Sequence, residues 1–448
     1  MTELQIRNHP GDPLSSLVGQ TALTFVAQIV AFVLAFASTT VLARVLGPEG
    51  KGMVALIVLI PSMIALFGNL GLGTANVYLI GKKKHPLEEI VGNTTFLFLA
   101  ITVLTGTAYC IFLPLIRDHV AKGADERLLL VALVILPAEL SGTYLTSILL
   151  GLGKIGRLSV VRIVRSTTQF LLILLLLVVW RLDILGGVIA TAVGMMCGAA
   201  IACAVVCRRA RVRPVVNKIL VRNSIAFGLK AHTGNVLQFF NYRLDYFVVN
   251  HFLGAAGLGI YTISVGLAEF IWYIPNSIAY VLFPKNASLD AKTATLVTEQ
   301  VSRHTLFITT IASLGLFMAS KPLIILFFRS DFLSSLLPLW ILLPGVVALS
   351  LSKVFCADLA SRGRPQYGSF AAGISLVVTV VLDLLFIPRY GVVGAALASS
   401  LSYTASALIV MVYYLKISGS KIRDVLLVER ADLAIYPDTI RRWIHYGE

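Results

Sequence analysis

Ionisable side chains inside long apolar segments are the residues of this sequence that could carry chemistry. In segment 158–180, Arg162, Arg165 and Gln169 share one helical face at i, i+3 and i+7 spacing. Two stacked guanidinium groups can bind phosphate in a fork geometry, or they can extend toward the headgroups at a membrane surface. The spacing therefore predicts either a cationic substrate site or a pair of interfacial arginines, and both interpretations stay open.

A polar stripe runs along segment 224–252, which is otherwise apolar. At about 100° per residue, its members fall within about 80° of one helical face. They are Lys230, Gln238, Asn241 and Asp245. We expect this stripe to line a substrate cavity, and a structural seam of hydrogen bonds is the alternative. His232 and Arg243 lie about 200 to 220° around the helix from Lys230, roughly opposite the stripe. We therefore expect them to pair with a neighbouring helix or interface.

Aromatic, amide and acidic side chains recur at helical spacing in segment 255–283. They are Glu269, Trp272, Tyr273, Asn276 and Tyr280. Rings and amides together suit the binding of sugars, although packing in a core also explains aromatic residues. Glu269 and Asn276 are therefore further candidates for the substrate cavity.

Isolated acids at membrane depth are candidates for ion coupling, because an ionised group in a bilayer is expensive and usually marks a functional site. The candidates are Glu139, Asp245, Glu269, Asp358 and Asp383. Glu139 is beside the kink expected at Pro137, and Asp358 is close to Lys353, so a structural role is the alternative for these two.

No pattern for nucleotide hydrolysis or covalent catalysis accompanies these residues. The sequence has neither a GxxxxGK[ST] phosphate loop nor an HExxH motif, and its loops are short. We therefore expect a transporter without a catalytic site, cofactor or metal, and not an enzyme.

The segments that must position these residues are typical of membrane spans. Hydrophobic residues make up 57% and charged residues 13% of the 448 positions, and the net charge of +15 is spread over short loops. A nucleic-acid-binding protein would instead gather its basic residues on one solvated face. Runs of about 20 apolar residues can cross a bilayer as helices. Twelve occur, at 16–46, 53–80, 91–115, 128–152, 158–180, 184–207, 224–252, 255–283, 301–319, 332–357, 367–387 and 392–415. The expected fold is an all-α polytopic membrane protein with about twelve transmembrane helices.

An internal repeat with an offset of 207 residues divides these segments into two halves. The pattern LGxxGxG at 46–52 returns at 253–259, Leu136-Pro137 as Leu343-Pro344, Gly156-Arg157 as Gly363-Arg364, and Gly187 as Gly394. Six segments per half predict two six-helix lobes related by a parallel repeat. The expected organisation is an N-terminal lobe (1–207), a basic cytoplasmic linker (208–222), a C-terminal lobe (223–415) and a cytoplasmic tail (416–448).

Lysine and arginine are distributed unequally between the two sets of loops. If both termini are cytoplasmic, the cytoplasmic segments carry 23 of the 37 basic residues and the opposite side carries nine. Because cytoplasmic loops carry the excess of positive charge, the sequence predicts that both termini are inside.

Several stretches resemble one family of transporters. They are VLARVLGPEGKGMVAL (41–56), LGLGTANVYLIGKK (70–83), NYRLDYFVVNHFLGAAGLGIYTI (241–263) and IPNSIAYVLFPK (274–285). They are similar to the polysaccharide flippase branch of the multidrug, oligosaccharidyl-lipid and polysaccharide exporter superfamily. The family's N-x-R-x-D pattern corresponds to Asn241, Arg243 and Asp245, and its next glutamate to Glu269.

The resemblance implies a multi-pass protein of the bacterial inner membrane. Such a flippase would translocate a polyprenyl-diphosphate-linked oligosaccharide for O-antigen, capsule or exopolysaccharide assembly, by alternating access of two lobes. The implied partners are the lipid-linked oligosaccharide, membrane lipids, H⁺ or Na⁺ as coupling ion, and the polysaccharide polymerase machinery. The alternatives are an ion-coupled multidrug exporter of the same superfamily, a scramblase without energy coupling, and a membrane-embedded polysaccharide polymerase or ligase.

Overall fold

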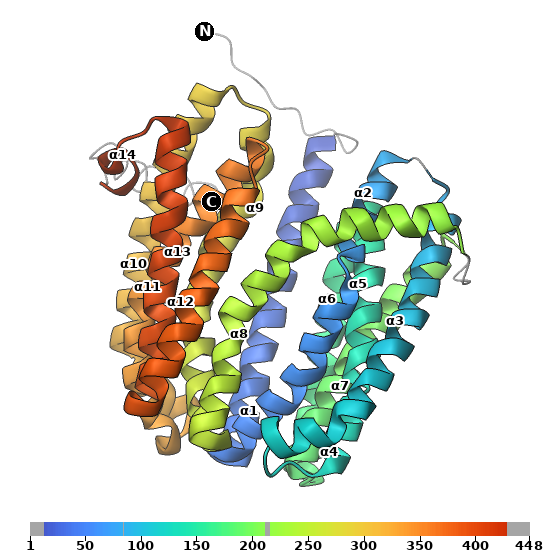
Figure 1. Cartoon of the computed structure of the whole chain (residues 1–448), viewed down its shortest axis with the longest axis vertical. Coiled ribbons are helices and arrows are strands. Elements are labelled where there is room, and N and C mark those ends of the chain that lie inside the picture. The colour runs from blue at the N-terminus through green and yellow to red at the C-terminus, as the bar shows by residue number, and fades with distance from the viewer. Residues whose placement is uncertain (1–12, 84, 211–215, 428–448) are drawn as a thin grey trace, which may run out of the picture. The chain divides into compact units, whose positions relative to one another are not determined.

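The computed structural model describes residues 13–83, 85–210 and 216–427, without the side chains of 13–25, 230 and 231 (Figure 1). These residues form helices and no strand. The expected all-helical fold is confirmed. Parts of the expected linker (211–215) and tail (428–448) lie outside the described residues.

The chain divides into two compact units, Met1–Thr233 and Gly234–Glu448. The boundary falls inside a helix, α8 (Lys218–Glu269), and not in the basic segment 208–222. The expected lobe limits stay a prediction.

The first unit consists of seven helices and the beginning of α8. They are α1 (Pro13–Asn69), α2 (Leu72–Lys82), α3 (Leu87–Leu115), α4 (Glu126–Ala132), α5 (Ile135–Gly151), α6 (Ile155–Ile173) and α7 (Asp183–Cys207). Wider π-helical turns, Ile116–Val120 and Leu174–Val179, extend α3 and α6. Two expected single spans are each divided in the structure: 53–80 at Leu70 and Gly71, where φ is positive, and 128–152 between α4 and α5.

The second unit consists of the rest of α8 and six further helices. They are α9 (Tyr273–Ala287), α10 (Ala291–Phe328), α11 (Leu336–Ser361), α12 (Gln366–Tyr390), α13 (Val392–Ser418) and α14 (Ile422–Leu426). Helices α10 to α13 run side by side as a bundle (Figure 1). Short α14 packs onto this bundle, because Arg303 of α10 donates to the Asp424 carbonyl at 2.6 Å and Val425 is fully buried.

Ten helical stretches in the described residues are long and apolar enough to cross a membrane. Two of them, Val26–Asn69 and His232–Ala287, are far longer than the thickness of a bilayer requires. Each contains one glycine with non-helical backbone angles, Gly47 (φ 67°, ψ −174°) or Gly254 (φ 69°, ψ −175°). This conformation is accessible almost only to glycine, so each stretch comprises two helices joined at a reversal. If each of these two long stretches is counted as two helices, the ten stretches are compatible with the twelve expected spans.

The repeat as a whole stays a prediction. Gly47 and Gly254 adopt the same conformation, but another pair of landmarks differs. Gly156 lies within the first turn of α6, whereas Gly363 has a φ of +74° in the turn before α12.

Close packing between α6 and α7 orients the polar face of α6. A Cβ atom on Gly194 of α7 would lie 2.8 Å from the Cβ of Gln169, and one on Gly198 would lie 3.1 Å from the Cβ of Arg165. Small residues let two membrane helices approach closely. The approach directs Arg165 and Gln169 along the side of α7.

Candidate functional site

The basic face of α6 carries an uncompensated positive charge. Arg162 is exposed, and no ion pair is recorded for it among the described residues. Arg165, whose side chain is 42% exposed, lies 3.7 Å from the carboxylate of Glu139 on α5. Gln169 donates to the hydroxyl of Thr191 on α7 at 3.3 Å. Glu139 is therefore the neighbour of an arginine and not an isolated acid, while Arg162 is available to an anionic ligand.

Asn241 and Asp245 of α8 lie in the interior of the second unit, each only 1% exposed. Asn241 donates to the Ser375 hydroxyl at 2.9 Å and accepts from Thr379 at 2.9 Å. Asp245 accepts from the Tyr261 hydroxyl at 2.6 Å. Both side chains belong to a hydrogen-bonded seam, the alternative that the sequence left open, and a large substrate could not reach them in this state.

The rest of the polar stripe is less buried. Gln238 is half-buried, and the side chain of Lys230 lies outside the described part of the structure. Lys230 belongs to the unit Met1–Thr233, and Gln238, Asn241 and Asp245 belong to Gly234–Glu448.

Arg243 forms an ion pair with Glu269, the last residue of α8. Two parallel contacts join the guanidinium to the carboxylate, at 2.7 and 3.1 Å. The two side chains are 28% and 23% exposed, and Arg243 also covers the ring of Tyr246 at 5.2 Å. Arg243 thus pairs with another helical arm, as its angular position on α8 predicted.

Lys353 of α11 is a polar group that sequence reasoning noted only as a neighbour of Asp358. Its ammonium donates to the Asn276 side chain at 2.7 Å and lies 4.7 Å from the ring centroid of Trp272. Trp272 packs in turn against Tyr242 and Tyr403, with centroid separations of 4.7 and 5.6 Å. A lysine in an apolar segment was the available signal, but only the fold brings it to the aromatic rings of Trp272 and Tyr242.

The exposed side of α9 carries the expected aromatic and amide groups. Tyr273 is 44% and Tyr280 is 74% exposed, and Asn276 lies between them on the same side. Trp272, which precedes α9, is instead 6% exposed and belongs to the core. The surface that sugars could contact is therefore formed by the tyrosines and Asn276, with Lys353 beside it.

Asp383 of α12 differs from the other candidate acids. It is completely buried, and neither carboxylate oxygen has a hydrogen-bond partner in the described part of the chain. An ionised carboxylate in such a place would be costly. This isolation makes Asp383 a stronger candidate for carrying a proton than the hydrogen-bonded Asp245.

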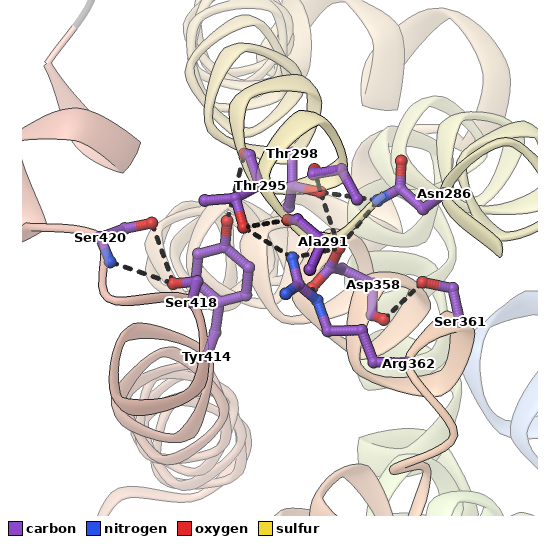
Figure 2. A network of polar contacts seen from close by, with 11 residues as sticks. Asn286, Ala291, Thr295, Thr298, Asp358, Ser361, Arg362, Tyr414, Ser418 and Ser420 are labelled. Carbon is purple, nitrogen blue, oxygen red and sulfur yellow. Dashed lines mark hydrogen bonds and ion pairs between the residues drawn. The ribbon is translucent and has the colours of Figure 1, made fainter. Parts of the chain in front are cut away.

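Asp358, in contrast, is the centre of a network that joins helix ends (Figure 2). Its carboxylate accepts from Asn286 at 2.8 Å, from Thr298 at 3.0 Å and from the Nε of Arg362 at 2.7 Å. Arg362 also donates to the Thr295 hydroxyl at 2.8 Å. Because its charge is balanced and its oxygens are occupied, Asp358 has a structural role and is not a lone acid.

No group of three metal-ligating side chains that could hold a metal ion occurs in residues 13–83, 85–210 and 216–427. The accessible candidate groups described above are basic, aromatic and amide side chains, whose chemistry suits phosphates and sugars.

A family model described as polysaccharide biosynthesis protein matches residues 41–337. This chain belongs to that family. The chain is also similar to proteins of two other organisms. Membrane protein MJ1068 of Methanocaldococcus jannaschii is 24% identical over 43% of this chain and 39% of its own length. The probable low-salt glycan biosynthesis flippase Agl15 of Haloferax volcanii is 22% identical over 37% of this chain. The alignments span 39% and 36% of the length of these two relatives.

Two solved structures share the fold of this chain over most of its length. The lipid II flippase MurJ, in an inward closed conformation, has a TM-score of 0.74 with 16% identity over 90% of this chain and 89% of its own. An inward-facing multidrug resistance MATE family transporter of the MOP superfamily has a TM-score of 0.70 with 16% identity over 88% of this chain and 98% of its own. The predicted resemblance is thereby confirmed, and the chain is a multi-pass membrane protein with this transporter fold.

Proposed function

We propose that this protein is a flippase that moves a polyprenyl-diphosphate-linked oligosaccharide across the bacterial inner membrane for surface polysaccharide assembly. Its two lobes would expose the polar headgroup alternately to the two sides, while the polyprenyl chain stays in lipid. No covalent step is part of the proposal. The excess of basic residues in one set of loops supports cytoplasmic termini.

The observation that carries the proposal is the imbalance of accessible charge among the candidate residues. Arg162 is exposed without an acidic partner, and Arg165 has only one at 3.7 Å. The candidate acids are each paired or buried: Glu139, Asp245, Glu269, Asp358 and Asp383. A diphosphate would supply the missing negative charge, whereas a cationic drug would need an accessible acid. The imbalance favours the flippase over the multidrug exporter.

The exposed side of α9 supports a sugar as the other part of the substrate. Tyr273 and Tyr280 present ring surface, and Asn276 and Lys353 present polar groups beside it. Tyrosine combines an apolar ring with a polar hydroxyl, which suits the alternating apolar and polar faces of sugar rings. Gln238 is a further candidate for this contact, whereas Lys230 is a candidate for binding the diphosphate. The polysaccharide polymerase machinery is the proposed recipient of the product.

Ion coupling is a separate part of the proposal. Asp383 is buried without a hydrogen-bond partner among the described residues, and Asp245, Glu269 and Glu139 are the other candidates. We infer that Asp383 carries a proton in this state and releases it when the lobe rearranges. The likeness to a multidrug transporter fold and this carboxylate keep an ion-coupled multidrug exporter as the second candidate function.

The test is protection of a fluorescent diphospho-polyprenyl oligosaccharide from an impermeant glycosidase in proteoliposomes. We expect the wild type to expose the inner-leaflet pool, and Arg162→Ala/Arg165→Ala to lower the rate by about tenfold or more, because each lost charged hydrogen bond costs about 1.5 kcal/mol or more. The control is Arg127→Ala/Arg181→Ala, which removes the same charge from the same unit.

Two results would contradict the proposal at different points. Unchanged transport by the double α6 variant would leave the arginines as interfacial groups. Continued protection by the wild type, with several glycans and imposed ion gradients, would favour drug export.

A further inference from the structure

A pocket of about 330 Å³ lies between α6 and α7, where α6 begins and α7 ends. Arg157 belongs to the first turn of α6, and Arg208 directly follows α7. The other lining side chains are apolar and lie up to two turns further along the helices. They are Val160, Ile201, Ala204 and Val205. The pocket thus combines two guanidinium groups at the helix ends with apolar walls behind them.

The two positive charges have no acidic partner among the residues that the structure describes. Both arginines are exposed, neither forms an ion pair with another described residue, and no acidic side chain lines the pocket. Lys154, which precedes α6, and Arg209 add positive charge at the same end of the unit. Arg208 also complements the negative end of the α7 dipole, but this effect does not account for Arg157 at the start of α6.

The apolar walls of the pocket favour a ligand that has an apolar part as well as a negative charge. Val160 is 50% exposed and Ala204 is exposed, so a free phosphate would leave this apolar surface uncovered. A zwitterionic lipid would cover the walls without neutralising the arginines. We propose that the pocket binds an anionic phospholipid of the surrounding leaflet, with its phosphate between Arg157 and Arg208 and an acyl chain along Val160 and Val205.

This pocket is distinct from the basic face of α6 that is proposed to meet the substrate. At about 100° per residue, Arg162 is separated around the helix by about 140° from Arg157 and about 160° from Val160, and Arg165 by about 80° and 140°. Arg162 is therefore on the opposite side of α6 from the pocket, and Arg165 lies between the two sides. The lipid site does not depend on what the protein transports, and its test contains no transport measurement.

The experiment is a lipid titration of the detergent-purified full chain, followed by native mass spectrometry. We expect phosphatidylglycerol to bind more tightly than phosphatidylcholine, and Arg157→Ala/Arg208→Ala to weaken the binding of phosphatidylglycerol by about thirtyfold, since each basic residue near an anionic lipid contributes a factor of about five. Arg127→Ala/Arg181→Ala is the matched control, because these exposed arginines of the same unit do not line the pocket.

A second variant tests the apolar walls without a change of charge. Ala204→Phe would fill the pocket, and we expect it to lower phosphatidylglycerol retention while both arginines remain. Three results would overturn the proposal. The wild type would bind the two lipids equally, the control and the Arg157→Ala/Arg208→Ala variant would lose phosphatidylglycerol binding equally, or inorganic phosphate would displace phosphatidylglycerol completely. Displacement of the bound lipid by a polyprenyl-diphosphate glycan would also overturn it and assign the pocket to the substrate.

Discussion

The network around Asp358 predicts that Asp358→Ala destabilises the second unit substantially. The carboxylate is fully buried and joins three segments through Asn286, Thr298 and Arg362 (Figure 2). Removing it leaves the guanidinium of Arg362, 15% exposed, without its counter-charge. Each of the three donors that bond to Asp358 keeps one other acceptor, such as the Thr295 hydroxyl for Arg362.

The magnitude follows from these contacts. Breaking a buried ion pair by removing one partner costs about 3 to 5 kcal/mol. Because the donors retain second partners and Arg362 can reach solvent, we expect the lower end, about 3 kcal/mol. Arg362→Ala leaves the carboxylate buried with two neutral donors, so we expect about 4 kcal/mol. The double variant should be more stable than the sum of the single effects predicts, by about 2 kcal/mol, because it removes both charges together.

The assay is unfolding of the purified protein in mild detergent, followed by tyrosine and tryptophan fluorescence against denaturant. A thermal scan should show a drop in Tm of about 6 °C or more for Asp358→Ala. Asp331→Ala is the control, since Asp331 is an exposed acid of the same unit that forms no ion pair with the described residues. Two results would refute the reasoning. One is a change in unfolding free energy below about 0.5 kcal/mol for Asp358→Ala, which is the usual range for a surface substitution. The other is a double variant whose destabilisation equals the sum of the two single effects.

Three further predictions concern other parts of the chain. Gly71→Ala places a Cβ atom 2.1 Å from the carbonyl oxygen of Gly228, so we expect a loss of more than about 2 kcal/mol; Gly123→Ala, also at positive φ but with nothing within 4 Å, should cost less in the same unfolding assay. Hydrogen bonds from the first turn of α10 hold the pKa of Asp290 below its ordinary value of 3.8. A lowered folded-state pKa means that this stabilisation is present above pH 3.8 and is lost as the pH falls through the folded value, so the Tm difference between wild type and Asp290→Ala should shrink in that acidic range. Asp383→Asn should remove the dependence of flipping on a pH gradient in the proteoliposome assay, and an unaltered dependence would exclude Asp383 as the coupling group.

Much of the candidate site could be listed from the sequence, but its division into roles could not. Arg162 and Arg165 were identified by helical spacing, and the structure leaves both accessible on α6. Asn241 and Asp245 were on the same list, yet they are bonded to hydroxyls of Ser375 on α12, Ser399 on α13 and Tyr261 further along α8. A helical angle says which side of a helix a residue occupies, and it does not say what covers that side.

The sequence by itself determined that this chain is an all-helical membrane protein of the polysaccharide biosynthesis family. Apolar length is a local property that each segment expresses alone, because a bilayer requires every backbone polar group to be paired within its own helix. The glycines at positions 47 and 254 likewise specify reversals locally, through a conformation that other residues avoid. Only the tertiary structure decided the inter-helix partners of the buried polar groups, such as Asn286 and Thr298 for Asp358 and Glu269 for Arg243. These pairings depend on close approach between helices, which no single segment encodes.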